Sequence, residues 1–231
     1  MSSSLPALVG AVIGDLVSAT GVALGGVAGA AGTAILERLM TRRLETARET
    51  FLEELRRGGN RLEPEPDEIV AIVYRYMRAA QEGSARLNLR LMAKVVHGLA
   101  HTGNLVADKF LYHADRVASL RREEIILLAT IHRHQKRLTE KKMSGENVQP
   151  YVDMRDAVER DLVPRVFPDT ETLRAVAAGT IRTGYIHDDL MTLDSVSIFQ
   201  TTPLLDELIS LAPLDAALDA ESSSERVREK S

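Results

Sequence analysis

The histidines are the side chains of this chain whose type and spacing come nearest to a chemical site. His97 and His101 lie four positions apart, so on a helix they share one face. Such a pair can hold a metal ion, and His113 or Asp108 would be the third ligand. The zinc-protease pattern requires Glu directly after the first His, and Gly98 stands there instead. We therefore expect half-buried histidines on a packed helix and no metal site.

Other residue types also lack a catalytic arrangement. No nucleophile elbow, phosphate-binding loop or dinucleotide fingerprint appears in the sequence. The acidic residues Asp188, Asp189 and Asp194 lack the spacing of a calcium-binding loop, and we expect a solvated turn there. The sequence therefore predicts no catalytic residue, no cofactor and no enzymatic activity.

A basic cluster, "HRHQKRLTEKK", is a candidate binding surface for anionic lipid or nucleic acid. Its cations are Arg133, Lys136, Arg137, Lys141 and Lys142. The alternative interpretation is a solvated helix end, and the neighbouring His132 and His134 are expected to belong to the same basic surface.

The composition is that of a helical globular protein. Of the 231 residues, 45% are hydrophobic and 27% charged, while only 4% are aromatic, and Ala, Leu, Arg and Glu recur throughout. The absence of cysteine excludes disulfides, thiolate metal sites and cysteine nucleophiles. The first residues do not form a secretory signal, so we expect a cytoplasmic protein, with the inner face of the membrane as an additional location.

An uncharged run, "LVSATGVALGGVAGAAGTAIL", extends from Leu16 to Leu36 and is long enough to span a bilayer. Gly21, Gly25 and Gly29 are spaced by four and form a smooth helix-packing strip, the small-xxx-small arrangement of paired membrane helices. Five glycines cost an exposed helix about 4–5 kcal/mol relative to alanine, so another surface must compensate. The alternatives are insertion into a membrane, self-association, and burial against the body of the protein.

The sequence divides into four segments. We expect residues 1–61 to hold the glycine-rich segment and an amphipathic helix, and residues 62–145 to form a helical bundle. Residues 146–220 form an acidic module, and residues 221–231 read as a disordered tail without core-forming residues. Their net charges are +1, +4, −9 and 0, so the acidity of the chain is concentrated in the third segment.

The expected fold is mainly α, with helices marked by caps and breakers. Gly58-Gly59 and Gly83 are expected to end helices, and Ser84 and Ser119 to begin the next ones as N-caps. In the last third, "SVSIFQ" predicts a strand over 195–200, paired with residues near 185–186 in a short hairpin. Thr202 followed by Pro203 predicts a helix start.

Helix, helix, strand and helix in this order suggest a C-terminal winged-helix-like module. A module that reads DNA presents Lys and Arg along its recognition helix, but the helix here offers only Arg174 and Arg182. We therefore expect the module not to bind duplex DNA.

The order of parts resembles the Abi-alpha (abortive infection alpha) family of bacterial proteins. The resemblance is carried by "ERLMTRRLETARETFLEELRRG" after the Gly/Ala-rich segment, by "SARLNLRLMAKVVHGLA" and "DKFLYHADRVASLRREEIILLATI", and by the ending "LRAVAAGTIRTGYI" then "FQTTPLLDELISL". It covers most of the chain as a pattern of hydrophobic spacing. The resemblance implies a role in phage defence without a known set of catalytic residues.

Three functions remain open at this point. The first is a non-enzymatic defence effector that associates with membranes or with itself through its glycine-rich helix. The second is a soluble helical scaffold or regulatory binding protein, and the third a winged-helix DNA-binding regulator. We expect the partner to be a second copy or another protein, or a membrane, and no small-molecule substrate is indicated.

Overall fold

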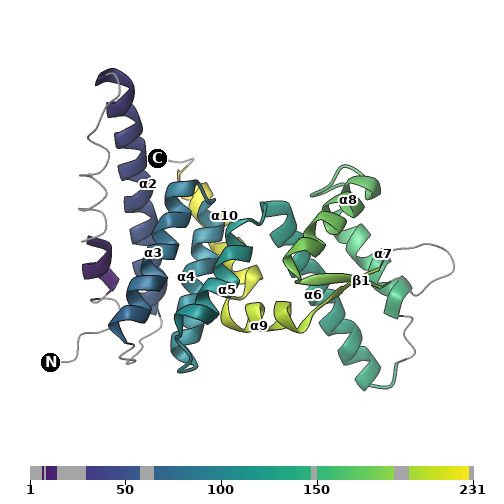
Figure 1. Cartoon of the computed structure of the whole chain (residues 1–231). Helices are drawn as coiled ribbons and strands as arrows, with labels where there is room; N and C mark the ends of the chain where they lie inside the picture. Colours follow the sequence, from purple (N-terminus) through teal and green to yellow (C-terminus); the bar gives the residue numbers. More distant parts are fainter. Residues whose placement is uncertain are drawn as a thin grey trace. The chain divides into compact units, whose positions relative to one another are not determined.

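In the computed structural model the chain is mainly helical, with one small two-stranded antiparallel sheet (Figure 1). The structure describes residues 7, 9–14, 30–57, 65–146, 150–189 and 198–228. The chain forms two compact units. The first comprises Met1–Ser119 with Ala220–Ser231, and the second comprises Leu120–Asp219.

The first unit is built around one central helix. Its helices are α2 (Ala30–Arg57), α3 (Pro66–Glu82), α4 (Arg86–His101) and α5 (Ala107–Ala118), and α4 packs against the other three. Apolar side chains around most of the circumference of α4 are buried, among them Leu91, Met92, Val95, Val96 and Leu99. This breadth of burial is typical of a helix that is surrounded by neighbours.

Aromatic packing and buried polar groups join α2 to its neighbours. The rings of Phe51 and Tyr76 lie 4.3 Å apart, and the Tyr76 hydroxyl donates a hydrogen bond of 3.0 Å to the Ala47 carbonyl. Burial raises the pKa of Tyr76 above its ordinary value, so the hydroxyl remains a donor. Lys94 on α4 lies 3.2 Å from the buried carboxylate of Glu54 on α2.

The second unit contains the sheet. Its elements are α6 (Arg122–Met143), α7 (Pro150–Leu162), α8 (Thr170–Thr180), the 3₁₀ turn η1 (Ile181–Thr183), β1 (Ile186–Asp189), β2 (Ile198–Thr201), α9 (Pro203–Leu211) and the first residues of α10 (Leu214–Arg228). Helix α6 packs against α7, α8 and β2. The core of this unit therefore lies along the N-terminal half of α6, where Ile125, Leu127, Leu128 and Ile131 are buried.

The predicted hairpin is confirmed. Strands β1 and β2 pair antiparallel, with Ile186 opposite Thr201 and Asp189 opposite Ile198. Asp188 and Asp189 belong to β1 and not to a turn, while Asp194 lies outside the described residues. The turn before β1 contains Gly184 with φ of 72°, a backbone conformation that glycine adopts without strain.

Two predicted helix ends are confirmed and two caps are not where the sequence placed them, while the end predicted at Gly58-Gly59 lies outside the described residues. Gly83 ends α3 in the left-handed conformation, as predicted, and Pro203 occupies the first turn of α9. Ser119 ends α5 and does not begin α6, because its hydroxyl donates a hydrogen bond of 2.8 Å to the Arg116 carbonyl. Ala85, and not Ser84, precedes the first residue of α4. Both serines stand in short connections, where a polar residue serves either neighbouring helix.

Two segment boundaries differ from those drawn on the sequence. Helix α6, assigned above to the 62–145 bundle, belongs to the second unit, and the units meet in sequence at Ser119 and Leu120. Helix α10 continues to Arg228, through a segment that reads as a disordered tail. Near the start of this segment Glu221 is only 6% exposed, and its carboxylate lies 3.7 Å from Arg90 and 3.8 Å from Arg86.

The glycine strip predicted at Gly21, Gly25 and Gly29 lies outside the described residues. Residues 9–14 are helical, and at Gly10 and Gly14 an added Cβ would meet no described atom within 4 Å. None of the described helices is long and apolar enough to cross a bilayer.

Candidate functional site

The cations predicted to contact an anionic surface lie on the C-terminal half of α6, and they fall into two groups. Lys136, Arg137, Lys141 and Lys142 are exposed, and no ion-pair partner for them lies among the described residues. Arg133 is already engaged, because its guanidinium lies 2.7 Å from the Asp215 carboxylate. The structure thus leaves four of the five predicted cations open to solvent.

The two histidines of the same cluster each lie beside a carboxylate. His134 is buried, with Nε2 2.9 Å from the Asp161 carboxylate on α7, and His132 lies 3.7 Å from Asp206. The hydrogen bond between His134 and Asp161 lowers the pKa of Asp161, so this carboxylate stays ionised and joins α6 to α7. His134 therefore joins α6 to α7, and His132 lies beside a carboxylate of α9.

A groove of about 410 Å³ runs between α6 and α7. Helix α6 contributes a stripe at positions 134, 137, 138 and 141, and helix α7 contributes positions 156, 157 and 160. The lining residues are His134, Arg137, Leu138, Lys141, Asp156, Ala157 and Arg160. Two of the four exposed cations, Arg137 and Lys141, therefore line a concave site.

Arg160 is the residue of this groove that the sequence did not reveal. It stands in the segment with a net charge of −9, so the charge sum hid it. The short connection between α6 and α7, residues 144–149, could have predicted this position. A connection of this length makes neighbouring helices antiparallel. That arrangement brings the end of α7 back beside the middle of α6, as the contact between His134 and Asp161 shows.

In the second unit, a cluster of hydrogen bonds around the buried carboxylate of Glu124 joins neighbouring elements. The buried carboxylate of Glu124 accepts hydrogen bonds from both terminal nitrogens of Arg182, from Thr180 Oγ1 at 3.3 Å and from the Arg121 backbone N–H at 2.8 Å. Burial by itself raises the pKa of Glu124, but these hydrogen bonds outweigh burial and hold the pKa below its ordinary value. The cluster attaches the end of α8 to the start of α6.

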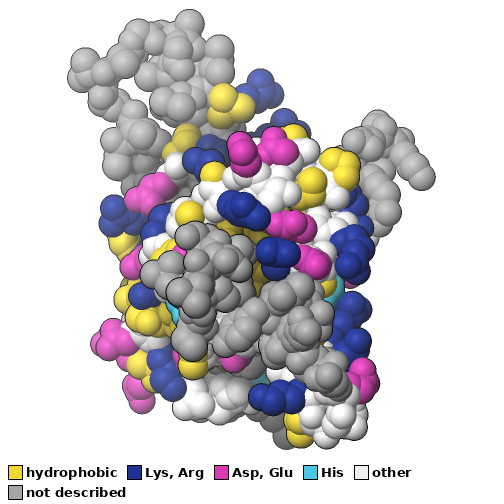
Figure 2. All heavy atoms as spheres, turned by 90° about the vertical axis from the view of Figure 1, so that its right-hand side faces the viewer, with side chains coloured by type: hydrophobic (Ala, Val, Ile, Leu, Met, Phe, Trp, Pro, Cys, Tyr) yellow, Lys and Arg dark blue, Asp and Glu magenta, His cyan; other side chains and the backbone are white. Residues whose placement is uncertain are grey.

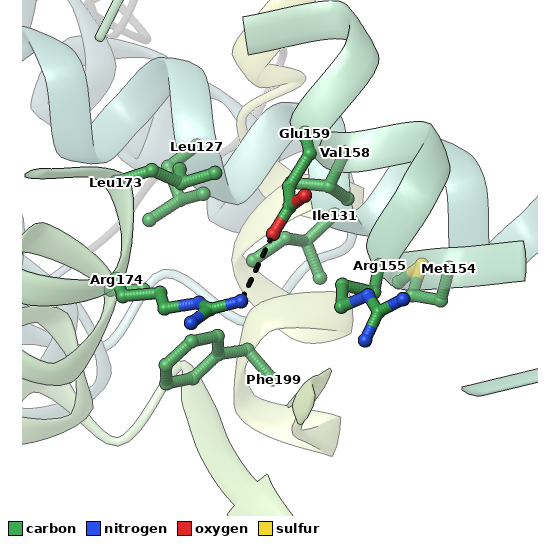
Figure 3. Close-up of a pocket in the computed structure, with 10 residues that line it drawn as sticks. Leu127, Ile131, Met154, Arg155, Val158, Glu159, Leu173, Arg174 and Phe199 are labelled. Atoms are coloured by element: carbon green, nitrogen blue, oxygen red, sulfur yellow. Dashed lines mark hydrogen bonds and ion pairs between the residues drawn. The ribbon is translucent and has the colours of Figure 1, made fainter. Parts of the chain in front are cut away.

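A separate apolar pocket lies where α6, α7, α8 and β2 meet (Figure 3). Its volume is about 40 Å³, and Leu127, Ile131 and Val158 are among its walls. Arg174 and Glu159 form an ion pair of 3.4 Å across it, as the dashed line in Figure 3 shows. Ligand pockets are typically about 300–1,000 Å³, so this space is a packing gap and not a substrate site.

A second groove, of about 670 Å³, lies in the first unit among α2, α3 and α4 and is lined in part by Arg42, Arg43 and Arg86. Two of these arginines already have partners within the unit. Arg43 donates a hydrogen bond of 3.4 Å to the Gly83 carbonyl, and Arg86 lies 3.8 Å from Glu221. This groove is therefore less suited to an anion than the one between α6 and α7.

The histidine pair on α4 has the geometry of packed side chains. The rings of His97 and His101 are stacked, with centroids 6.3 Å apart, and burial together with His101 and Lys94 lowers the pKa of His97. No group of three or more metal-ligating side chains comes together within the described ranges. His97 is thus a neutral ring at the edge of the core.

Among the side chains coloured in Figure 2, those of Lys and Arg are interspersed with those of Asp and Glu. A local arrangement, such as the groove between α6 and α7, is therefore the more specific recognition feature.

Comparisons of the chain with protein-family models, with curated proteins and with solved structures gave no match.

Proposed function

We propose that the chain is a non-enzymatic effector of bacterial defence, of the abortive-infection kind, that acts by binding at the inner face of the membrane. The basic end of α6 contacts the anionic surface, and the glycine-rich segment inserts or self-associates. The observation that carries the membrane contact is a set of exposed cations that form no ion pair with any described residue, namely Lys136, Arg137, Lys141 and Lys142. The defence role is supported by the sequence resemblance stated above.

Electrostatics make this contact plausible in magnitude. A cation close to an anionic leaflet contributes about 1 kcal/mol, so four such cations supply reversible attachment but not permanent anchoring. The glycine-rich run would add the apolar component, since stable attachment requires two signals. Attachment of this kind is sensitive to salt.

A soluble helical scaffold is the alternative, and it differs in its use of the glycine-rich run, which would then pack on the body or join two copies. A winged-helix regulator is disfavoured. The order α8, β1, β2 and α9 matches such a module, but Arg174 and Arg182 are both paired, with Glu159 and Glu124. Removing them from these partners to contact phosphates would cost stability, so we expect no submicromolar DNA binding near 150 mM salt.

Vesicle co-sedimentation tests the membrane contact. The full chain should bind vesicles of phosphatidylcholine with phosphatidylglycerol, and binding should fall in high salt and be absent with phosphatidylcholine alone. The double variant Lys136→Gln/Lys142→Gln should bind several-fold more weakly. The matched control is Arg48→Gln/Lys109→Gln, which removes the same charge from exposed positions of the first unit. Equal binding by the two double variants contradicts the proposal.

Substitutions at Gly25 test the glycine strip. Gly25→Leu should keep membrane partitioning but reduce self-association in crosslinking, because a large side chain separates two closely packed helices. Gly25→Ala adds one methyl group and about 0.8–1 kcal/mol of helix propensity, so it should remain close to the parent. If both variants crosslink like the parent, Gly25 makes no close helix contact.

A further inference from the structure

The groove between α6 and α7 gathers three cations from two helices. Arg137 and Lys141 lie one turn apart on α6, and Arg160 faces them from α7. No described carboxylate forms an ion pair with any of the three. Like charges that converge without a counter-ion repel one another, so the site is suited to an anionic ligand.

The acidic neighbours of the groove are already occupied. Asp156, the one carboxylate in the lining, accepts hydrogen bonds of 3.0 and 2.9 Å from the guanidinium of Arg155. Asp161 is held by His134 at 2.9 Å. Both carboxylates thus pair with groups other than the three cations.

We propose that this groove binds a phosphate monoester group between Arg137, Lys141 and Arg160. A guanidinium presents a planar fork of donors that matches phosphate oxygens, and a lysine adds a compact charge, so two arginines and a lysine suit a dianion. The volume of about 410 Å³ holds the phosphate together with part of its ester substituent, for which Leu138 and Ala157 supply a short apolar wall.

The proposal sharpens the membrane contact proposed above and rests on it for the lipid source of the ligand. A contact made by charge alone does not distinguish Lys141 from Lys142, which are adjacent and equally exposed. A bound phosphate does distinguish them, because Lys141 lines the groove and Lys142 does not. Arg160 adds a second distinction, since it lies outside the basic run of α6.

The experiment uses the full chain and two sets of vesicles matched for surface charge. One contains phosphatidic acid, whose headgroup is a phosphate monoester, and the other phosphatidylglycerol, whose phosphate is a diester. We expect at least tenfold tighter binding to phosphatidic acid. Lys141→Gln and Arg160→Gln should each remove most of the preference for phosphatidic acid, and Arg160→Lys should keep part of it. The control Lys142→Gln should change the ratio of the two affinities less than twofold.

A soluble arm identifies the source of the phosphate. Glycerol 3-phosphate is titrated into the full chain and into Arg160→Gln by calorimetry. Binding that Arg160→Gln abolishes, without a preference for phosphatidic acid, assigns the groove to a soluble ester. The proposal is overturned if neither probe distinguishes the groove variants from Lys142→Gln. The membrane function alone fails if no anionic vesicle binds while glycerol 3-phosphate still does so through Arg160.

Discussion

The two units of this protein differ in where their charged side chains lie and in how these are paired. In the first unit, two buried carboxylates lie beside cations of α4, with Glu54 close to Lys94 and Glu221 close to Arg86 and Arg90. The second unit buries Glu124 against Arg182 but leaves the cations of the α6–α7 groove at its surface. A buried pair fixes which helices come together, whereas an exposed cation contributes little to stability and remains free to bind.

The largest effect should come from removing one partner of the buried pair in the first unit. Lys94→Met removes the ammonium group that lies 3.2 Å from the carboxylate of Glu54, a side chain that is only 3% exposed. Breaking a buried pair in this way typically costs about 3–5 kcal/mol of unfolding free energy. Urea denaturation followed by circular dichroism measures the loss.

The double variant Glu54→Leu/Lys94→Met is the control for that measurement. It removes both charges, so it should recover most of the lost stability, because apolar replacements of a buried pair are often neutral or stabilising. A single variant Lys94→Met that unfolds at the same urea concentration as the parent would show that Glu54 does not depend on Lys94.

A smaller effect, with a definite pH dependence, is expected at Glu124. Its folded pKa lies below the unfolded value, so ionised Glu124 stabilises the protein above the unfolded pKa, and this contribution disappears as the pH falls through the folded pKa. Glu124→Gln should therefore cost about 2 kcal/mol at pH 7, the value of a charged hydrogen-bond set with a half-exposed partner. As the pH falls below the folded pKa of Glu124, the parent and the variant should converge.

Thermal unfolding of both proteins between pH 3 and pH 7 checks this dependence. A stability gap that stays constant over the whole range would show that ionised Glu124 is not the stabilising form.

The pH-dependent contribution of Asp161 to stability should have the same sign as that of Glu124 but be smaller. The hydrogen bond to His134 lowers its pKa, so its contribution is present at neutral pH and is lost on acidification. Its side chain is 36% exposed, and solvent screens the interaction. Asp161→Asn should therefore lower the melting temperature less than Glu124→Gln at pH 7, and the reverse order would contradict the ranking by burial.

The smallest change in stability is expected at Arg160, where the comparison between the units is sharpest. The guanidinium has no ion-pair partner among the described residues, so Arg160→Gln should alter the unfolding free energy by no more than about 0.5 kcal/mol. The same variant should strongly weaken phosphate binding. A large loss of stability would mean that Arg160 serves packing and not recognition.

Local patterns were sufficient to place most of the secondary structure. Gly83, Pro203 and the alternating residues of β2 act on their own neighbourhood, so a helix end, a helix start and a strand are visible without any knowledge of the fold. The same applies to the basic run on α6, because its cations are contiguous in the chain. Patterns of this kind depend on backbone sterics and on side-chain period, which are properties of the sequence.

The partners of charged residues were decided by the tertiary structure. The helix at 221–228 reads as a disordered tail because it carries no apolar anchor, yet Glu221 is buried beside Arg86 and Arg90, more than 130 positions away. Arg133 and Lys136 look equally free in the sequence, but among the described residues a carboxylate, that of Asp215, pairs with Arg133 and none pairs with Lys136. Arg160 likewise joins the groove through the return of α7 along α6. Coulomb interactions depend on distance in space and on burial, and neither quantity is encoded in the spacing of residues along the chain.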